Sequence, residues 1–159
     1  MATPLVESPR LSIFVVEEGG LIGDRAERIR RAGGAAYIFR QHREEHPESF
    51  ARRCRAQLRE LEEKGAQMDE ATLIGGGTRR KERTLSRAAL IRALTAQMVR
   101  LGRGTLTLTG RDEDRRVMES LAEIMREQIV GAGVEIRAVF EGSSERERPR
   151  DDGARMTRP

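Results

Sequence analysis

The chain has 159 residues, of which 37% are hydrophobic, 35% charged and only 3% aromatic, and its formal net charge at pH 7 is +4. This length is enough for one core of ordinary domain size, which must be aliphatic because aromatic rings are so few. With no tryptophan and a single tyrosine, the chain lacks the rings on which nucleic-acid bases stack, so we do not expect an RNA-recognition surface.

Five short runs rich in β-branched and aliphatic residues are typical of strands. In chain order they cover residues 11–17, 35–40, 71–75, 105–109 and 134–140. Four segments with helical periodicity separate them, over residues 24–32, 47–64, 85–101 and 114–130. The second helix has the clearest limits, because Pro47 suits a first helical position and Gly65 suits the residue after the last turn.

The apolar residues of the last two helices are spaced so that each helix presents one stripe to the sheet. In the third helix the predicted stripe consists of Leu90, Ile91, Leu94, Met98 and Leu101. In the fourth helix it consists of Val117, Leu121, Ile124, Gln128 and Ile129.

The strict alternation of strands and helices predicts βαβ crossovers and therefore an α/β fold. We expect a three-layer α/β/α domain with a mostly parallel, doubly wound sheet of five strands, covered on both faces and either Rossmann-like or flavodoxin-like. The order 2-1-3-4-5 is the commonest for this number of strands. The domain should span residues 11–141, between a flexible N-terminus at 1–10 and a disordered charged tail at 142–159, which has two prolines and nine charged residues.

The most informative local pattern is GGGTRRKER, which begins at Gly75 and follows the third predicted strand. In such sheets ligands bind outside the carboxyl ends of the strands, and a glycine-rich turn before a helix brings backbone N–H groups and the positive end of the helix toward an anion. Residues 76–103 contain eight basic residues and one acidic residue, whereas charges nearly cancel over residues 40–64. We therefore predict a site for an anionic small molecule that carries phosphate.

The ligand of that site would be a nucleotide or a phosphorylated metabolite, and the cofactor, where one is used, would be a nucleotide. The predicted binding residues are Gly75, Gly76, Gly77, Thr78, Arg79, Arg80 and Arg83. The predicted periphery of the site consists of Glu17, Glu18, Thr109 and Asp112.

Three alternatives remain open, because the pattern is neither a Walker motif nor a GxGxxG turn. The glycines would otherwise form only a flexible turn with solvated arginines. Nucleic-acid binding through residues 76–103 would require Arg83 and Arg87 to lie on one continuous exposed face. A protein–protein interaction or scaffold domain, self-associating or not, would require an exposed aliphatic patch of several hundred Å².

No spacing of residues marks a general acid, a general base or a nucleophile, so we expect a non-catalytic binding or regulatory module rather than an enzyme. The carboxylates that an enzyme would use are Glu17, Glu18 and Asp112. His42 and His46 match the His-x-x-Glu-His string of inverted zinc peptidases. Pro47, however, places the helix start after His46, so the two imidazoles do not share a helical face and we predict no metal site.

The lone cysteine, Cys54, lies on the apolar stripe of the second helix, which indicates a buried and unreactive thiol. It has no second cysteine to pair with inside the chain. The first residues lack the basic and apolar regions of a secretion signal, and no apolar run is long enough to span a bilayer. We therefore expect a cytoplasmic protein with no membrane partner.

The predicted alternation also resembles that of receiver domains of two-component systems. Glu17 and Glu18 stand where a receiver keeps its metal-binding acidic pair, and Thr109 is similar to the hydroxyl residue that ends the fourth strand. The third strand ends in Gly75, where the phosphoacceptor aspartate of a receiver would stand, and no lysine follows the fifth strand. The resemblance covers the topology and two positions, so it does not imply a phosphoacceptor.

Overall fold

The computed structural model describes residues 11–76 and 81–141, and the predictions made for residues 1–10, 77–80 and 142–159 lie outside this part. Strands and helices alternate along the described chain, as the sequence predicts. The elements are β1 (Leu11–Val16), α1 (Arg25–Arg31), β2 (Ala35–Arg40), α2 (Pro47–Glu63), β3 (Met68–Ile74), α3 (Lys81–Leu101), β4 (Gly104–Arg111), the short 3₁₀ helix η1 (Asp112–Asp114), α4 (Arg115–Gln128) and β5 (Val134–Glu141).

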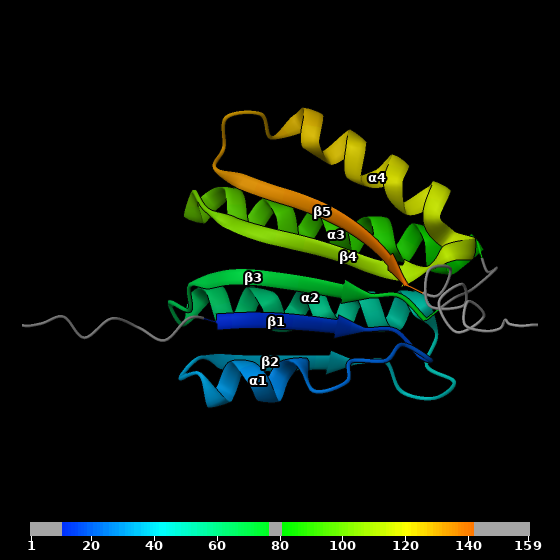
Figure 1. Ribbon diagram of the computed structural model, residues 1–159, viewed down its shortest axis with the longest axis horizontal. Coiled ribbons are helices and arrows are strands. Elements are labelled where there is room, and N and C mark those ends of the chain that lie inside the picture. The colour runs from blue at the N-terminus through cyan, green and yellow to red at the C-terminus, as the bar shows by residue number, and fades with distance from the viewer. Residues whose placement is uncertain (1–10, 77–80, 142–159) are drawn as a thin grey trace, which may run out of the picture.

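The five strands form one parallel sheet in the order β2-β1-β3-β4-β5, with helices on both sides (Figure 1). The predicted fold class is confirmed. Helix α1 lies on one side of the sheet, and α2, α3 and α4 lie on the other, because right-handed crossovers change sides where the strand order reverses. That reversal falls between β1 and β3, the place where sheets of this kind hold ligands at the carboxyl ends of the strands.

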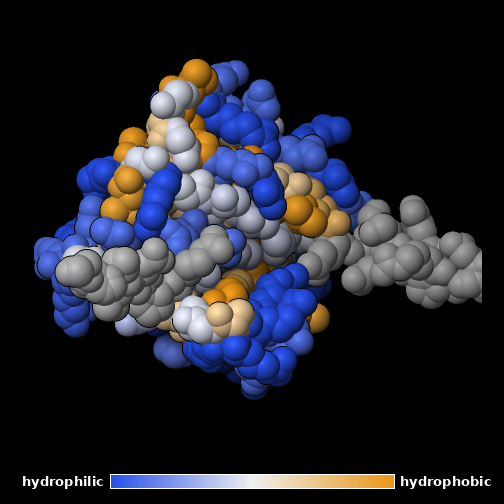
Figure 2. Space-filling model, turned by 60° about the vertical axis from the view of Figure 1, so that its left-hand side comes forward, coloured by the Kyte–Doolittle hydropathy of each residue, from blue (hydrophilic) through white to orange (hydrophobic). Residues whose placement is uncertain are grey.

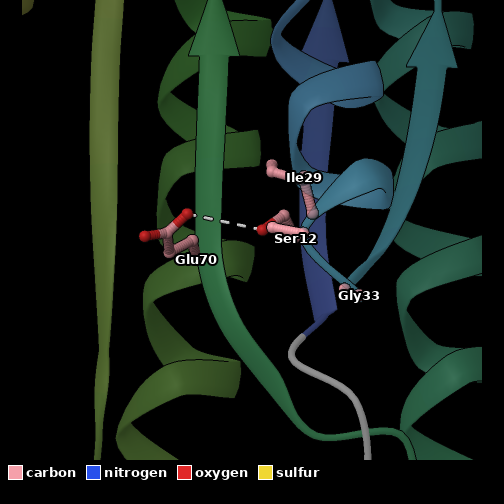
Figure 3. A pocket seen from close by; sticks show the side chains of 6 residues that line it. Ser12, Ile29, Gly33 and Glu70 are labelled. Carbon is pink, nitrogen blue, oxygen red and sulfur yellow. Dashed lines mark hydrogen bonds between the residues drawn. The ribbon is translucent and has the colours of Figure 1, made fainter.

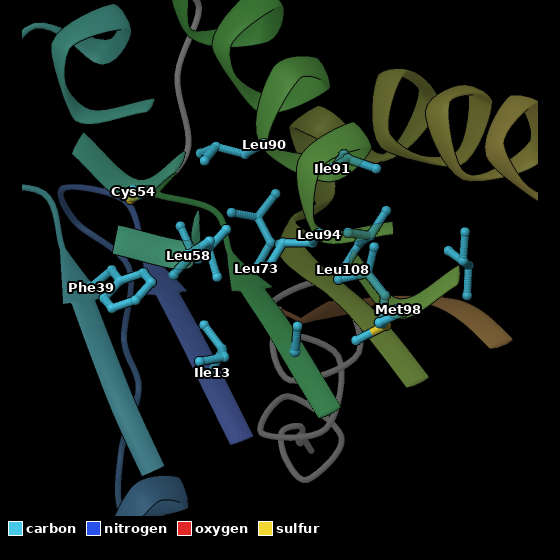
Figure 4. Packing of buried hydrophobic residues seen from close by; sticks show 14 of the residues in the cluster. Ile13, Phe39, Cys54, Leu58, Leu73, Leu90, Ile91, Leu94, Met98 and Leu108 are labelled. Atoms are coloured by element: carbon cyan, nitrogen blue, oxygen red, sulfur yellow. The ribbon is translucent and has the colours of Figure 1, made fainter. Parts of the chain in front are cut away.

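The main core lies between the sheet and the layer formed by α2, α3 and α4. Figure 4 shows Ile13, Leu73 and Leu108 of three neighbouring strands beneath Leu58 of α2 and Leu94 of α3, and each of these side chains is at most 3% exposed. Most of this core is aliphatic, as expected from the composition, and Phe39, Phe50 and Phe140 are its aromatic members.

The opposite face of the sheet has a smaller core under α1, formed by Phe14, Val16, Ala26 and Ile74. In the described part of the chain no helix lies on this side of β3, β4 and β5 (Figure 1). The alternate residues of β4 differ accordingly: Leu106 and Leu108 are buried in the main core, whereas Thr105 and Thr107 are partly exposed. The helical cover of the sheet is therefore unequal.

The predicted apolar stripe of α3 is confirmed, since Leu90, Ile91, Leu94 and Met98 are buried. The helix nevertheless begins at Lys81, one turn earlier than predicted. Ser86 therefore lies inside the helix, where it is buried. None of the described helices combines the length and the apolar character needed to cross a bilayer.

The predicted stripe of α4 is correct only in part, since Leu121 and Ile129 pack against the core. Met118, Ala122 and Met125 form its buried face, while Val117 and Ile124 are 40% and 50% exposed. The apolar residues of α4 occupy more of the helix circumference than β4 and β5 can cover, because α4 lies at the edge of the sheet over β5 (Figure 1). Only part of this apolar surface is therefore buried against the strands.

Candidate functional site

The buried carboxylate of Glu17 organises the carboxyl end of the sheet at the switch point. Glu17 follows β1 directly and is 3% exposed. Its Oε1 accepts hydrogen bonds from the backbone N–H of Gly76 at 2.9 Å and from Arg87 Nη2 at 2.7 Å, and its Oε2 accepts one from Arg87 Nε at 2.6 Å. One side chain thus joins the end of β1, the turn after β3 and helix α3 through charge-assisted hydrogen bonds.

The guanidinium of Arg87 holds a second carboxylate as well. Arg87 is 1% exposed, and its Nη2 donates to Asp114 Oδ2 at 3.2 Å. Burial acts to lower the pKa of Arg87, but the hydrogen bond and the charge of Glu17, together with Asp114, raise it overall. Arg87 is therefore a fixed cation that links β1 and α3 to the η1 segment at the end of β4.

Two of the predicted site residues, Gly75 and Gly76, form the start of the turn after β3. The N–H of Gly75 donates to the carbonyl oxygen of Thr109 at 2.7 Å, and that of Gly76 donates to Glu17. A Cβ atom on Gly76 would lie 1.8 Å from the carbonyl oxygen of Glu18, so only glycine allows the two loops to approach this closely. These N–H groups organise the turn itself.

The loop that follows β1 is held from three sides. Gln41 Oε1, at the end of β2, accepts the backbone N–H of Glu18 at 2.8 Å, and Arg111 Nη2, at the end of β4, donates to the carbonyl oxygen of Gly19 at 3.2 Å. Arg83 Nη2, from α3, lies 4.0 Å from Glu18 Oε1. Two arginines therefore border this loop at the carboxyl edge of the sheet, one of them buried and one exposed.

The structure brings together most of the predicted site residues that it describes. Glu17, Glu18 and Thr109 all lie against the turn at Gly75 and Gly76. Asp112 instead accepts a hydrogen bond from Arg115 Nε at 2.8 Å, at the start of α4. The remaining predicted binding residues, Gly77, Thr78, Arg79 and Arg80, lie outside the described residues.

Sequence reasoning missed Gln41, Arg111, Asp114 and the buried role of Arg87. A signal for Arg87 existed, because it continues the apolar spacing of α3 through Ile91, Leu94 and Met98. A charged residue in such a stripe needs a buried counterion, and Glu17 follows a strand whose residues are all buried.

The exposed basic face that nucleic-acid binding would require is not present on the described part of α3. Arg83 and Arg87 are 8% and 1% exposed. Nearer the end of the basic segment, Arg100 Nε and Nη2 donate to Glu62 at 2.5 and 2.7 Å, and Arg103 Nη2 lies 2.9 Å from Asp69 Oδ1. The requirement that Arg83 and Arg87 lie on one continuous exposed face is not met, because α3 directs them into the protein.

His42 and His46 lie before α2, whose first residue is Pro47. His46 Nδ1 accepts the backbone N–H of Glu48 at 3.1 Å and so caps the helix, while His42 is exposed. Among residues 11–76 and 81–141 no group of three or more His, Cys, Asp or Glu side chains is arranged to hold a metal ion. The structure gives these histidines the positions expected from Pro47.

Cys54 is buried against the core, as predicted, and its burial raises the pKa of the thiol to about 12. The thiol therefore stays protonated at neutral pH and is a poor nucleophile.

A separate pocket of about 300 Å³ lies at the other end of the strands, beside α1. Figure 3 shows its polar wall, where Ser12 Oγ of β1 donates to Glu70 Oε1 of β3 at 3.4 Å, next to Ile29 and Gly33. It shares no residue with the predicted site. No motif in the sequence indicates it, because its lining combines Ser12 and Glu70, from two strands, with residues of α1 and the turn that follows it.

Large exposed hydrophobic residues are distributed over several elements, with Leu21, Leu85 and Val130 at least 70% exposed. On the face shown in Figure 2, hydrophobic areas are separated by hydrophilic ones. The broad aliphatic patch that a scaffold domain would require is therefore not seen on this face.

Comparison with known proteins yields the fold and nothing finer. No family model matches the sequence, and no curated protein matches it either. The structure is similar to the crystal structure of a GDP-L-fucose synthetase from Naegleria fowleri, with a TM-score of 0.51 and 11% sequence identity over 88% of this chain and 52% of that chain. The chain thus spans about half the length of that protein, and the likeness shows a parallel sheet with helices on both sides in a Rossmann-like order.

Proposed function

We propose that this chain is a non-catalytic binding module for a phosphate-bearing small molecule, held at the turn between β3 and α3. The observation that carries the proposal is the buried chain of hydrogen bonds from Arg87 to Glu17 and from Glu17 to the N–H of Gly76. These hydrogen bonds fix the position of Gly76, which precedes residues 77–80 and α3 in the chain. A turn with a fixed base loses less conformational entropy when a ligand binds.

The charges around the turn support an anionic ligand. Glu17 contacts the turn directly, and its charge is balanced by the bidentate contact with Arg87. Arg83 and Arg111 border the neighbouring loop, and the sequence adds Arg79, Arg80 and Lys81 within the turn and the first residue of α3. The beginning of a helix also favours negative charge, so these contributions have the same sign.

The internal hydrogen bonds also restrict which groups would hold the ligand. Because the N–H groups of Gly75 and Gly76 already donate to Thr109 and Glu17, the proposed contacts come from residues 77–83. This arrangement suits a nucleotide or a phosphorylated metabolite whose phosphate lies at the start of α3.

A thermal-shift experiment tests the proposal. Inorganic pyrophosphate and nucleoside di- and triphosphates should raise the melting temperature of the full chain, since a ligand at about 100 times its Kd stabilises the folded state by about 2.7 kcal/mol. The double variant R79A/R80A should lose this shift. Arg92→Ala is the matched control, because Arg92 is an exposed arginine farther along α3 and its loss should leave the shift unchanged.

The proposal is wrong if none of these phosphates stabilises the native chain. It is equally wrong if Arg92→Ala reduces the shift as much as the double variant does, because the effect would then reflect net charge alone.

A further inference from the structure

A groove between α2 and α3 is the most specific surface feature outside the proposed ligand site. It has a volume of about 260 Å³ and lies near the first turns of both helices, lined by Glu48, Ala51, Arg55, Leu85, Ser86 and Ala89. Three of these six side chains are alanine or serine, and Ala51 and Ser86 are buried at its floor. The groove is therefore open because its residues are small, and a larger side chain could fill it.

Leu85 stands at the edge of the same groove with 70% of its surface exposed. Other leucines of α3, Leu90 and Leu94, are at most 1% exposed. A single exposed leucine is common in soluble proteins and needs no explanation. Here, however, it lies directly beside a hole of the kind that receives an apolar side chain in a protein interface.

The charges along the groove supply a second observation. Glu48 and Arg55 lie on α2 seven residues apart, which is two helical turns, so they share one side of the helix. Within the described residues neither side chain has a hydrogen bond or an ion pair. At the other end of the same two helices, Glu62 of α2 pairs with Arg100 of α3. The groove beside Leu85 therefore carries one unpaired acidic side chain and one unpaired basic side chain.

We propose that a second copy of this chain binds in the α2–α3 groove, related to the first by a two-fold axis. Leu85 of one copy would enter the hole lined by Ala51, Ser86 and Ala89 of the other. The same rotation would bring Glu48 toward Arg55 of the partner copy, twice in each dimer.

A second copy is the occupant that these features favour because the patch is complementary to itself. An interface across a two-fold axis uses the same surface twice, so it must carry both members of every contact. This groove carries a protruding leucine and a hole, and also a free acid and a free base on one side of one helix. The proposal does not depend on phosphate binding, since none of the six lining residues belongs to the proposed ligand site.

Sedimentation equilibrium of the full chain over a wide concentration range tests the proposal. The native chain should form a dimer, and Leu85→Glu should raise the dimer Kd by at least about tenfold, as expected for the loss of a central apolar anchor. Circular dichroism must show that this variant keeps its helical content. Arg116→Glu is the control for charge, because Arg116 is exposed on α4 and away from the groove.

Charge exchange gives a second and independent measurement. Glu48→Arg and Arg55→Glu should each weaken the dimer by opposing like charges, whereas the double exchange E48R/R55E should restore it. A native chain that sediments as a monomer throughout overturns the proposal. So does a dimer that Leu85→Glu leaves intact, or a double exchange that is no tighter than the single variants.

Discussion

Helix α3 carries two ion pairs of the same geometry in different surroundings. Near its first turns Arg87 contacts both carboxylate oxygens of Glu17, and near its end Arg100 contacts both oxygens of Glu62, with all four distances between 2.5 and 2.7 Å. The first pair is almost completely buried, whereas the side chains of Arg100 and Glu62 are 57% and 30% exposed. Distances alone would rank the two pairs as equals.

Burial changes what each pair contributes. A buried pair must offset the cost of removing two charges from water, and the loss of one partner leaves the other buried without compensation. A surface pair gains little, because water and salt screen both charges whether or not they meet. We therefore expect the Arg87 pair to hold the fold and the candidate site together, and the Arg100 pair to be dispensable.

The largest effect should follow from Arg87→Ala. It would leave the carboxylates of Glu17 and Asp114 buried without their cation and should reduce the free energy of unfolding by about 3 to 5 kcal/mol. Urea denaturation followed by circular dichroism measures this. The double variant E17Q/R87M, which removes both the cation and the Glu17 charge and keeps side-chain volume, should cost less than the sum of its single variants. A loss below about 1 kcal/mol for Arg87→Ala would show that this pair behaves like a surface pair.

The next effect concerns the turn that Glu17 holds. Gly76→Ala would place a methyl group 1.8 Å from the carbonyl oxygen of Glu18, so one of the two loops must move. We expect a destabilisation of about 3 kcal/mol, as for other overpacked sites. Gly110→Ala is the matched control, because an added Cβ there would meet its nearest neighbour at 3.8 Å. If both variants unfold at the same urea concentration, the close approach of the loops is wrong.

A smaller effect is expected from Arg100→Ala, which should reduce the free energy of unfolding by at most about 1 kcal/mol, and by less in high salt. The hydrogen bond from Arg100 lowers the pKa of Glu62 below its ordinary value of 4.5. The folded state therefore holds the proton of Glu62 less tightly than the unfolded state does, and this contribution is present above pH 4.5 and is lost as the pH falls through the lowered pKa. The difference between the native chain and the variant should shrink in acid, and a difference that grows below pH 4.5 would contradict this sign.

The sequence predicts the alternation of elements and the parallel sheet, and it indicates a candidate site after β3, because each of these depends on local signals. The spacing of apolar residues marks the helices, and a glycine-rich turn after β3 marks the candidate site. The contact between Glu17 and Arg87 could not be predicted in the same way, since its partners are 70 residues apart and meet only once β1 and α3 are in place.

The sequence itself indicates the unequal cover of the sheet. A strand covered on both faces is apolar along its whole length, and all six residues of β1 are buried. In β4 the run TLTLT alternates, which is typical of a strand with one face in water. The exposed side of α4 has another cause. The sequence shows that this helix has an apolar side, but it does not show that the sheet ends beneath the helix.

The smallest effect should come from a third ion pair, in which both side chains are exposed. Arg137 Nε donates to Glu135 Oε2 at 2.9 Å on β5, where the side chains of the two residues are 58% and 57% exposed. The pKa of Glu135 is lowered by the hydrogen bond from Arg137, yet water and salt reach both groups freely. Glu135→Gln should leave the urea midpoint unchanged within experimental error at any salt concentration. A clear decrease of the urea midpoint would mean that hydrogen-bond geometry matters more than burial for the ion pairs of this protein. The expected difference between the Arg87 and Arg100 pairs could then not be attributed to burial.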